Sequence, residues 1–65
     1  MTIRLNGAPH ETATETIASL LDELGLPRQT VLVERNAQPL PRKDWETATL
    51  NEGDAIEILR VAAGG

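Results

Sequence analysis

The 65 residues of this chain include no cysteine, which limits the ways in which so short a sequence can hold a fold. Domains below roughly 70–80 residues usually supplement a small core with disulfides, metals or partners. Disulfides are excluded here, and His10 alone offers no zinc-binding cluster. We therefore expect one domain whose core is aliphatic. The aliphatic residues on which the fold must rely are Ile3, Leu5, Ile17, Leu20, Leu21, Leu24, Leu26, Val31, Leu32, Val33, Leu40, Leu50, Ile56, Ile58, Leu59 and Val61.

The charge balance argues against two classes of partner. Six Lys and Arg against ten Asp and Glu give a net charge of −4, which repels a phosphate backbone. Trp45 is the one aromatic residue, so the stacking surfaces of single-strand binders are missing. No stretch approaches the about 20 apolar residues of a membrane span, and no signal-peptide pattern opens the chain. We expect a cytoplasmic protein that binds other proteins, but no nucleic acid and no membrane.

The N-terminal residues predict a β-hairpin. Residues 1–5 alternate polar and apolar side chains, which is typical of a half-buried strand. Asn6-Gly7 follows, and this pair favours a type I′ turn because both of its residues tolerate positive φ. Residues 8–13 would return as a weak edge strand, since Pro9 removes a backbone donor.

Helical periodicity follows the hairpin and predicts a helix over 15–24. The spacing of Thr12 and Glu15 fits a capping box, and Thr14 is an alternative N-cap. Gly25 stands where a left-handed residue ends a helix, and a proline soon follows. The apolar face of this helix comprises Ile17, Leu20, Leu21 and Leu24.

The rest of the chain predicts three strands joined by turns, which makes the fold an α+β roll. In order, these are a strand at 31–33, a turn at 36–37, a short edge strand at 38–41, a turn or short helical connection at 42–45, a turn at 51–54 and a strand at 55–61. The helix would cross one face of a mixed sheet of four to five strands, with the first and last strands as central neighbours. This is the β-grasp, or ubiquitin-like, arrangement.

The last four residues, Ala-Ala-Gly-Gly, directly follow the last predicted strand. We expect a β-grasp domain over 1–61 and a flexible tail over 62–65. The α-carboxylate of Gly65 has an ordinary pKa of about 3.3–3.7, so it is ionised at neutral pH. It could attack the α-phosphate of ATP held by another enzyme, and glycines can pass through a narrow channel because they lack Cβ. An idle terminus is the alternative.

Motifs in the second half of the chain carry a family resemblance. They are Asn36, Pro41-Arg42 followed by Trp45, Gly53-Asp54-Ala55-Ile56-Glu57-Ile58, and the closing Ala63-Gly64-Gly65. Together they resemble the ThiS family, the ubiquitin-like sulfur carriers of thiamine biosynthesis. The resemblance implies that a ThiF-like adenylyltransferase adenylates Gly65 with Mg-ATP. A persulfide from a cysteine desulfurase or rhodanese-like donor then replaces AMP and leaves a thiocarboxylate, whose sulfur thiazole synthase accepts.

The same resemblance implies a carrier that is not an enzyme and binds no cofactor itself, since ATP and Mg belong to the activating enzyme. Gly65 would be the modified residue, with Gly64 and Ala63 as the tail before it. The lack of cysteine is consistent with this role, because no side-chain thiol competes with the terminus for sulfur.

Exposed apolar residues near the tail predict a docking surface. Leu59 and Val61, together with Leu32, would form an outward strip. The acidic residues Glu57, Asp54 and Glu52 could steer a basic partner. Isolated exposed aliphatic residues and solvated charges are the ordinary alternative.

Three other functions stay open. One is a sulfur carrier for molybdopterin or another sulfur metabolite. Another is a ubiquitin-like modifier that forms isopeptide bonds through Gly65, although a chain-building modifier usually has more lysines than Lys43 alone. The third is a plain interaction domain.

Overall fold

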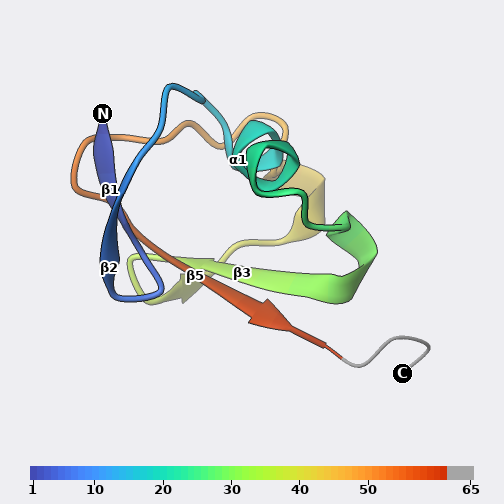
Figure 1. Cartoon of the computed structure of the whole chain (residues 1–65). Helices are drawn as coiled ribbons and strands as arrows, with labels where there is room; N and C mark the ends of the chain where they lie inside the picture. Colours follow the sequence, from blue (N-terminus) through green and yellow to red (C-terminus); the bar gives the residue numbers. More distant parts are fainter. Residues whose placement is uncertain (62–65) are drawn as a thin grey trace.

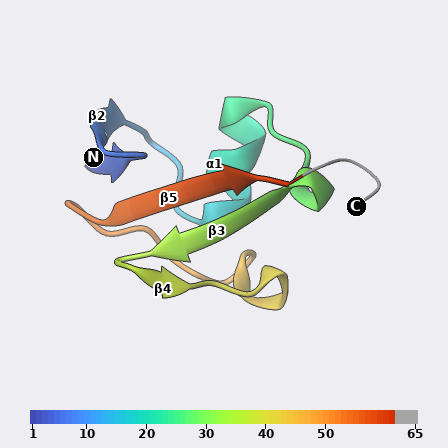
Figure 2. The same ribbon diagram turned by 90° about the horizontal axis from the view of Figure 1, so that it is seen from below.

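In the computed structural model, which describes residues 1–61, five strands form one mixed sheet in the order β2-β1-β5-β3-β4. The central strands β1 and β5 are parallel, and the other pairs are antiparallel. Helix α1 crosses one face of the sheet (Figures 1 and 2). The elements are β1 (Thr2–Leu5), β2 (Ala8–Glu11), α1 (Ile17–Leu24), η1 (Arg28–Thr30), β3 (Val31–Arg35), β4 (Gln38–Pro39), η2 (Arg42–Asp44) and β5 (Ala55–Arg60).

This architecture confirms the predicted α+β roll with β1 and β5 as central neighbours. The strand ends differ from the prediction: β2 and β4 are shorter, while β3 continues to Arg35 because it pairs with β5 over five residues. The short helix η1 was not predicted. The expected tail at 62–65 lies outside the described residues.

Backbone angles at the predicted turns explain why these residues stand there. Asn6 and Gly7 have φ of 50° and 85°, as a type I′ hairpin turn requires. Asn36 and Ala37 repeat the pattern with φ of 51° and 69°. Gly25 ends α1 with φ of 70°, in the left-handed region predicted for it.

The start of α1 differs from both predicted N-caps. The helix begins at Ile17, and Thr16 caps it by accepting a 3.1 Å hydrogen bond from Ser19 N–H. Thr12 and Thr14 were wrong as caps because their hydroxyls bond to each other at 2.7 Å, one turn before the helix. Three threonines at alternating positions offered equivalent local signals, and only the path of the chain selects among them.

The core lies between α1 and the inner face of the sheet. It comprises Ile3, Ile17, Ala18, Leu20, Leu21, Val31, Val33, Trp45, Leu50, Ile56 and Ile58. Leu5, Leu24, Leu26 and Leu40 are only partly buried against it. Leu32, Leu59 and Val61 are exposed, as predicted for the outward strip, because their places in the strand alternation turn them away from the helix.

A polar cluster joins β2 to α1. His10 Nε2 donates to Glu23 Oε2 at 2.9 Å, and Thr12 Oγ1 donates to Glu23 Oε1 at 2.8 Å. These hydrogen bonds, that from His10 above all, hold the pKa of the Glu23 carboxyl below its ordinary value of 4.5. A carboxyl whose pKa is lowered by folding stabilises the fold above its unfolded pKa and loses that effect in acid.

Replacing this carboxyl therefore gives a pH-dependent result. We expect Glu23→Gln to lower the thermal midpoint at neutral pH, and the difference from the parent to shrink as pH falls below 4.5. Thermal unfolding followed by circular dichroism between pH 3 and pH 7 measures both curves. Glu15→Gln, on an exposed carboxyl outside this cluster, is the control. A difference independent of pH would contradict the assignment.

Candidate functional site

Strand β5 carries the chain from the centre of the sheet to the last described residue. The backbone just after β5 is held in place, since Val61 N–H donates to Thr30 C=O at 2.9 Å. Figure 2 shows β5 and β3 side by side, with the end of β5 next to the start of β3. The predicted modified residue, Gly65, and the tail residues Gly64 and Ala63 lie outside the described residues. Their point of attachment is therefore this corner of the sheet.

Two leucines meet on the face of the sheet away from α1. Leu32 of β3 is directly opposite Leu59 of β5, and the two are 48% and 47% exposed. Val61 continues the row at 38% exposure. We call these three residues the outer-face patch. The sequence predicted their exposure, and the strand register brings the leucines into one pair.

A hollow of about 420 Å³ extends the outer-face patch toward β4 and η2. Leu32 and Leu59 form one side of it. The other side is lined by Pro39, Leu40, Pro41 and Trp45. Glu34 and Arg42 also line the hollow, so its wall is mainly apolar with one charge of each sign. A hollow of this kind next to an exposed apolar patch can receive a side chain of a partner.

An acidic pair adjoins the outer-face patch. Glu34 and Glu57 are opposite each other in the β3–β5 register, on the same face as Leu32 and Leu59. Like charges in this position destabilise a sheet, and neither carboxylate forms an ion pair within residues 1–61. Sequence reasoning proposed Glu57 but missed Glu34. The position of Glu34 directly after the inward-facing Val33 could have predicted that Glu34 lies on the outer face.

Asp54, which sequence reasoning offered as a steering charge, is instead a structural residue. Its side chain is buried, Oδ2 accepts from Asn51 N–H at 2.9 Å, and Oδ1 accepts from Asn36 Nδ2 at 3.2 Å. Asn36 in turn accepts from Ala55 N–H at 2.9 Å. The conformation of the turn before β5 satisfies these groups internally, so Asp54 is not available to a partner.

The Pro-Arg-x-x-Trp motif holds the η1–β3 junction. The indole of Trp45 is 2% exposed and donates to Leu40 C=O at 2.8 Å, and the Arg42 guanidinium lies 5.7 Å from its ring centroid. Arg42 also donates to three backbone carbonyls, those of Arg28, Gln29 and Val31. This motif therefore fixes the start of the strand that carries Leu32.

Residues 1–61 contain no group of three His, Asp or Glu side chains placed to hold a metal ion. Over the same range, no helix has both the length and the apolar character needed to cross a membrane.

Comparison with known proteins shows the family to which this chain belongs. The ThiS family model matches residues 3–65. A thiazole synthase from Paramagnetospirillum magneticum is 35% identical over 66 residues, which cover all of this chain but 20% of that protein. The chain thus spans about a fifth of the length of this curated relative.

Two solved structures are similar over the whole chain. The crystal structure of the thiamine biosynthesis protein ThiS from Geobacter metallireducens is 32% identical, with a TM-score of 0.84 and full coverage of both chains. The solution structure of a thiamine biosynthesis protein from the same organism is 30% identical, with a TM-score of 0.79 over all of this chain and 88% of that one.

Proposed function

Because this chain belongs to the ThiS family, we propose that it is a sulfur carrier of thiamine biosynthesis and not itself an enzyme. The observation that carries the proposal is the family match, which extends from residue 3 through the closing Gly64-Gly65. In the first step, the Gly65 carboxylate attacks the α-phosphate of ATP and pyrophosphate leaves. A ThiF-like adenylyltransferase in the cytoplasm supplies the ATP and Mg, and this chain supplies the carboxylate.

The second step replaces AMP by sulfur. The terminal sulfur of a persulfide, on a cysteine desulfurase or a rhodanese-like donor, attacks the acyl carbon and expels AMP. A thiol then cleaves the acyl disulfide, which leaves the thiocarboxylate on Gly65. Similarity to part of a protein named thiazole synthase supports a thiazole synthase as the acceptor of this sulfur.

The outer-face patch is the proposed docking surface for these partners. Its row of side chains ends at Val61, and four extended residues reach at most about 14 Å farther. A partner that covers Leu32 and Leu59 must therefore hold its reacting atoms close to the edge of the interface. Glu34 and Glu57 favour a partner with basic residues beside an apolar centre.

The function is tested by intact-mass analysis after incubation with the activating enzyme, ATP and a persulfide donor. A carrier gains one sulfur in place of one oxygen and remains monomeric on a denaturing gel. High-mass conjugates that survive thiols would instead indicate a protein modifier. A mass that stays unchanged with an activating enzyme shown to work on another carrier would contradict the proposal.

The docking surface makes a separate prediction. Leu59→Asp should leave the fold intact, because the side chain is 47% exposed, but slow thiocarboxylate formation by about tenfold or more, as loss of a central interface residue does. Single-turnover rates at limiting carrier concentration give the comparison. Ala8→Asp, an exposed position on β2, introduces the same charge away from the patch. Equal rates for the two variants would contradict docking at this face.

A further inference from the structure

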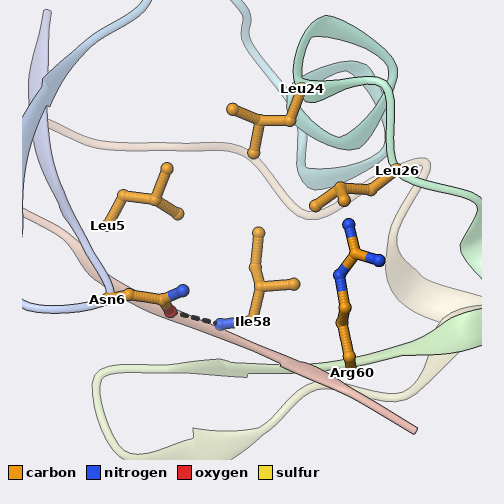
Figure 3. A pocket seen from close by; sticks show the side chains of 6 residues that line it. All are labelled: Leu5, Asn6, Leu24, Leu26, Ile58 and Arg60. Atoms are coloured by element: carbon orange, nitrogen blue, oxygen red, sulfur yellow. Dashed lines mark hydrogen bonds between the residues drawn. The ribbon is translucent and has the colours of Figure 1, made fainter. Parts of the chain in front are cut away.

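Along part of one edge of β5, the described residues 1–61 provide no neighbouring strand. The parallel neighbour β1 pairs with β5 only as far as Leu5 and Ile56. The side chain of Asn6 then takes the place of a strand, since its Oδ1 accepts from Ile58 N–H at 2.8 Å (Figure 3). Because alternate residues of a strand present their backbone groups to the same side, Ile58 C=O and Arg60 N–H face this edge. Within residues 1–61, no strand pairs with them.

An apolar hollow lies directly above this edge, on the helix side of the sheet. Its volume is about 410 Å³, within the range of side-chain and ligand pockets. Figure 3 shows that its walls come from the end of α1, the end of β1 and the last residues of β5. The lining residues are Leu5, Asn6, Leu24, Leu26, Ile58 and Arg60.

Arg60 gives this hollow a positive charge that no residue among 1–61 pairs with. Each of the other four arginines donates hydrogen bonds within the fold. Arg4, Arg35 and Arg42 donate to backbone carbonyls. Arg28 donates to the carboxylates of Asp22 and Glu46. Within residues 1–61, the Arg60 guanidinium makes no hydrogen bond or ion pair, and no acidic residue lines the hollow. Figure 3 shows it extended beside Leu26.

We propose that this edge and hollow bind an extended acidic segment of a partner protein by strand addition. The segment's backbone pairs with Ile58 C=O and Arg60 N–H. One aliphatic side chain fills the hollow, and a carboxylate meets the Arg60 guanidinium. Both side chains must lie on the helix side of the added strand, so they stand two residues apart. The recognised pattern is an aliphatic residue and Asp or Glu separated by one residue, in either order.

The other candidate occupants fit less well. A second copy that paired through its own β5 would present Ile56, Ile58 and Arg60 on the helix side, and it would bring no carboxylate to Arg60. The outer sheet edges are less suited to strand addition, since β2 contains Pro9 and β4 contains Pro39. The hollow lies on the opposite face of the sheet from the outer-face patch, so the experiment below tests this site separately from the proposed function.

The test is titration of the isotope-labelled full chain with short peptides, followed by NMR. The probes are acetyl-TTVTETT-amide and acetyl-TTETVTT-amide. The control, acetyl-TTVETTT-amide, has the same composition but places valine and glutamate on opposite faces. We expect shifts at the amides of Leu5, Asn6, Leu26, Ile58 and Arg60, and slower hydrogen exchange at Arg60 N–H. At least one probe should bind about two- to fivefold more tightly than the control, the effect of one exposed ion pair.

Charge reversal supplies the second arm. Arg60→Glu should lose the preference for the glutamate probes and favour acetyl-TTVTKTT-amide, and Arg60→Gln should bind both classes equally. One folded variant of the two is enough for the test, and the NMR spectrum of each variant shows whether its fold is retained. The proposal is overturned by no shifts at millimolar peptide, by equal affinity for the control peptide, or by shifts at Leu32 and Leu59 instead. A dimer whose interface contains Ile58 and Arg60, or a change at the Leu5 and Leu26 amides on removal of residues 62–65, would also overturn it.

Discussion

Removal of Gly65 is expected to abolish thiocarboxylate formation while leaving the fold unchanged. The shortened chain still ends in a carboxylate, now on Gly64, but this group is withdrawn by one residue, about 3.3–3.6 Å along an extended chain. A displacement of about 1 Å from a reactive geometry can slow a reaction about a hundredfold. Intact-mass analysis after incubation with the activating enzyme, ATP and the persulfide donor should therefore show no sulfur incorporation.

A matched control separates the carboxylate from the length of the chain. Semisynthetic protein with a Gly65 carboxamide keeps every side chain and the full length but removes the nucleophilic oxygen anion. We expect it to bind the activating enzyme as the parent does, and to form neither adenylate nor thiocarboxylate. Sulfur incorporation into the shortened chain or the carboxamide at the parent rate would refute the assignment of Gly65.

Replacement of Trp45 by alanine is expected to unfold most of the protein. The indole is 2% exposed within the core, and truncation of a buried aromatic residue typically costs about 3–5 kcal/mol. A single core of this size rarely supplies more than about 3–5 kcal/mol of stability, so the two quantities nearly cancel. The substitution also removes the hydrogen bond to Leu40 C=O and the ring beneath Arg42. Urea unfolding followed by circular dichroism measures the loss.

Two further variants test the cause of that loss. Trp45→Phe keeps most of the ring volume but lacks the donor to Leu40 C=O, so it should fall between the parent and Trp45→Ala. Leu59→Ala removes an aliphatic side chain that is 47% exposed, and it should change the free energy of unfolding by less than about 0.5 kcal/mol. A stable Trp45→Ala protein would contradict the structural role given to this motif.

Loss of Trp45 is also expected to disturb the outer-face patch. Arg42 holds the carbonyl of Val31 at the start of β3, one residue before Leu32. The Pro-Arg-x-x-Trp motif thus supports the proposed interface without contributing a reacting group.

The features that the sequence alone determined are those whose causes are local. Asn6-Gly7 adopts positive φ at both positions because few other residue pairs can do so, and Gly25 ends α1 for the same reason. The helix itself follows from apolar residues spaced for one face. The closing Gly64-Gly65 and the motifs before it identified the family in the same way, although the chemistry at Gly65 remains a proposal.

Only the tertiary structure decided which side chains meet. Thr16 caps the helix, which begins at Ile17, while the Thr12 hydroxyl bonds to Glu23, a partner eleven residues away across the β2–α1 contact. The strand register pairs Leu32 with Leu59 and places Glu34 beside Glu57, and no local signal specifies a register between distant strands.

Asp54 and Arg60 show in two contrasting ways that sequence alone does not reveal the partners of a charged side chain. Both are charged residues near a strand end, but folding surrounds Asp54 with donors from Asn36 and Asn51, whereas Arg60 extends over an apolar hollow without a partner among residues 1–61. Whether a charge is satisfied within the fold or left for another molecule depends on long-range neighbours. Alternation and spacing in the sequence predict on which face of a strand or helix a residue lies. The packing of distant segments decides which groups that residue contacts.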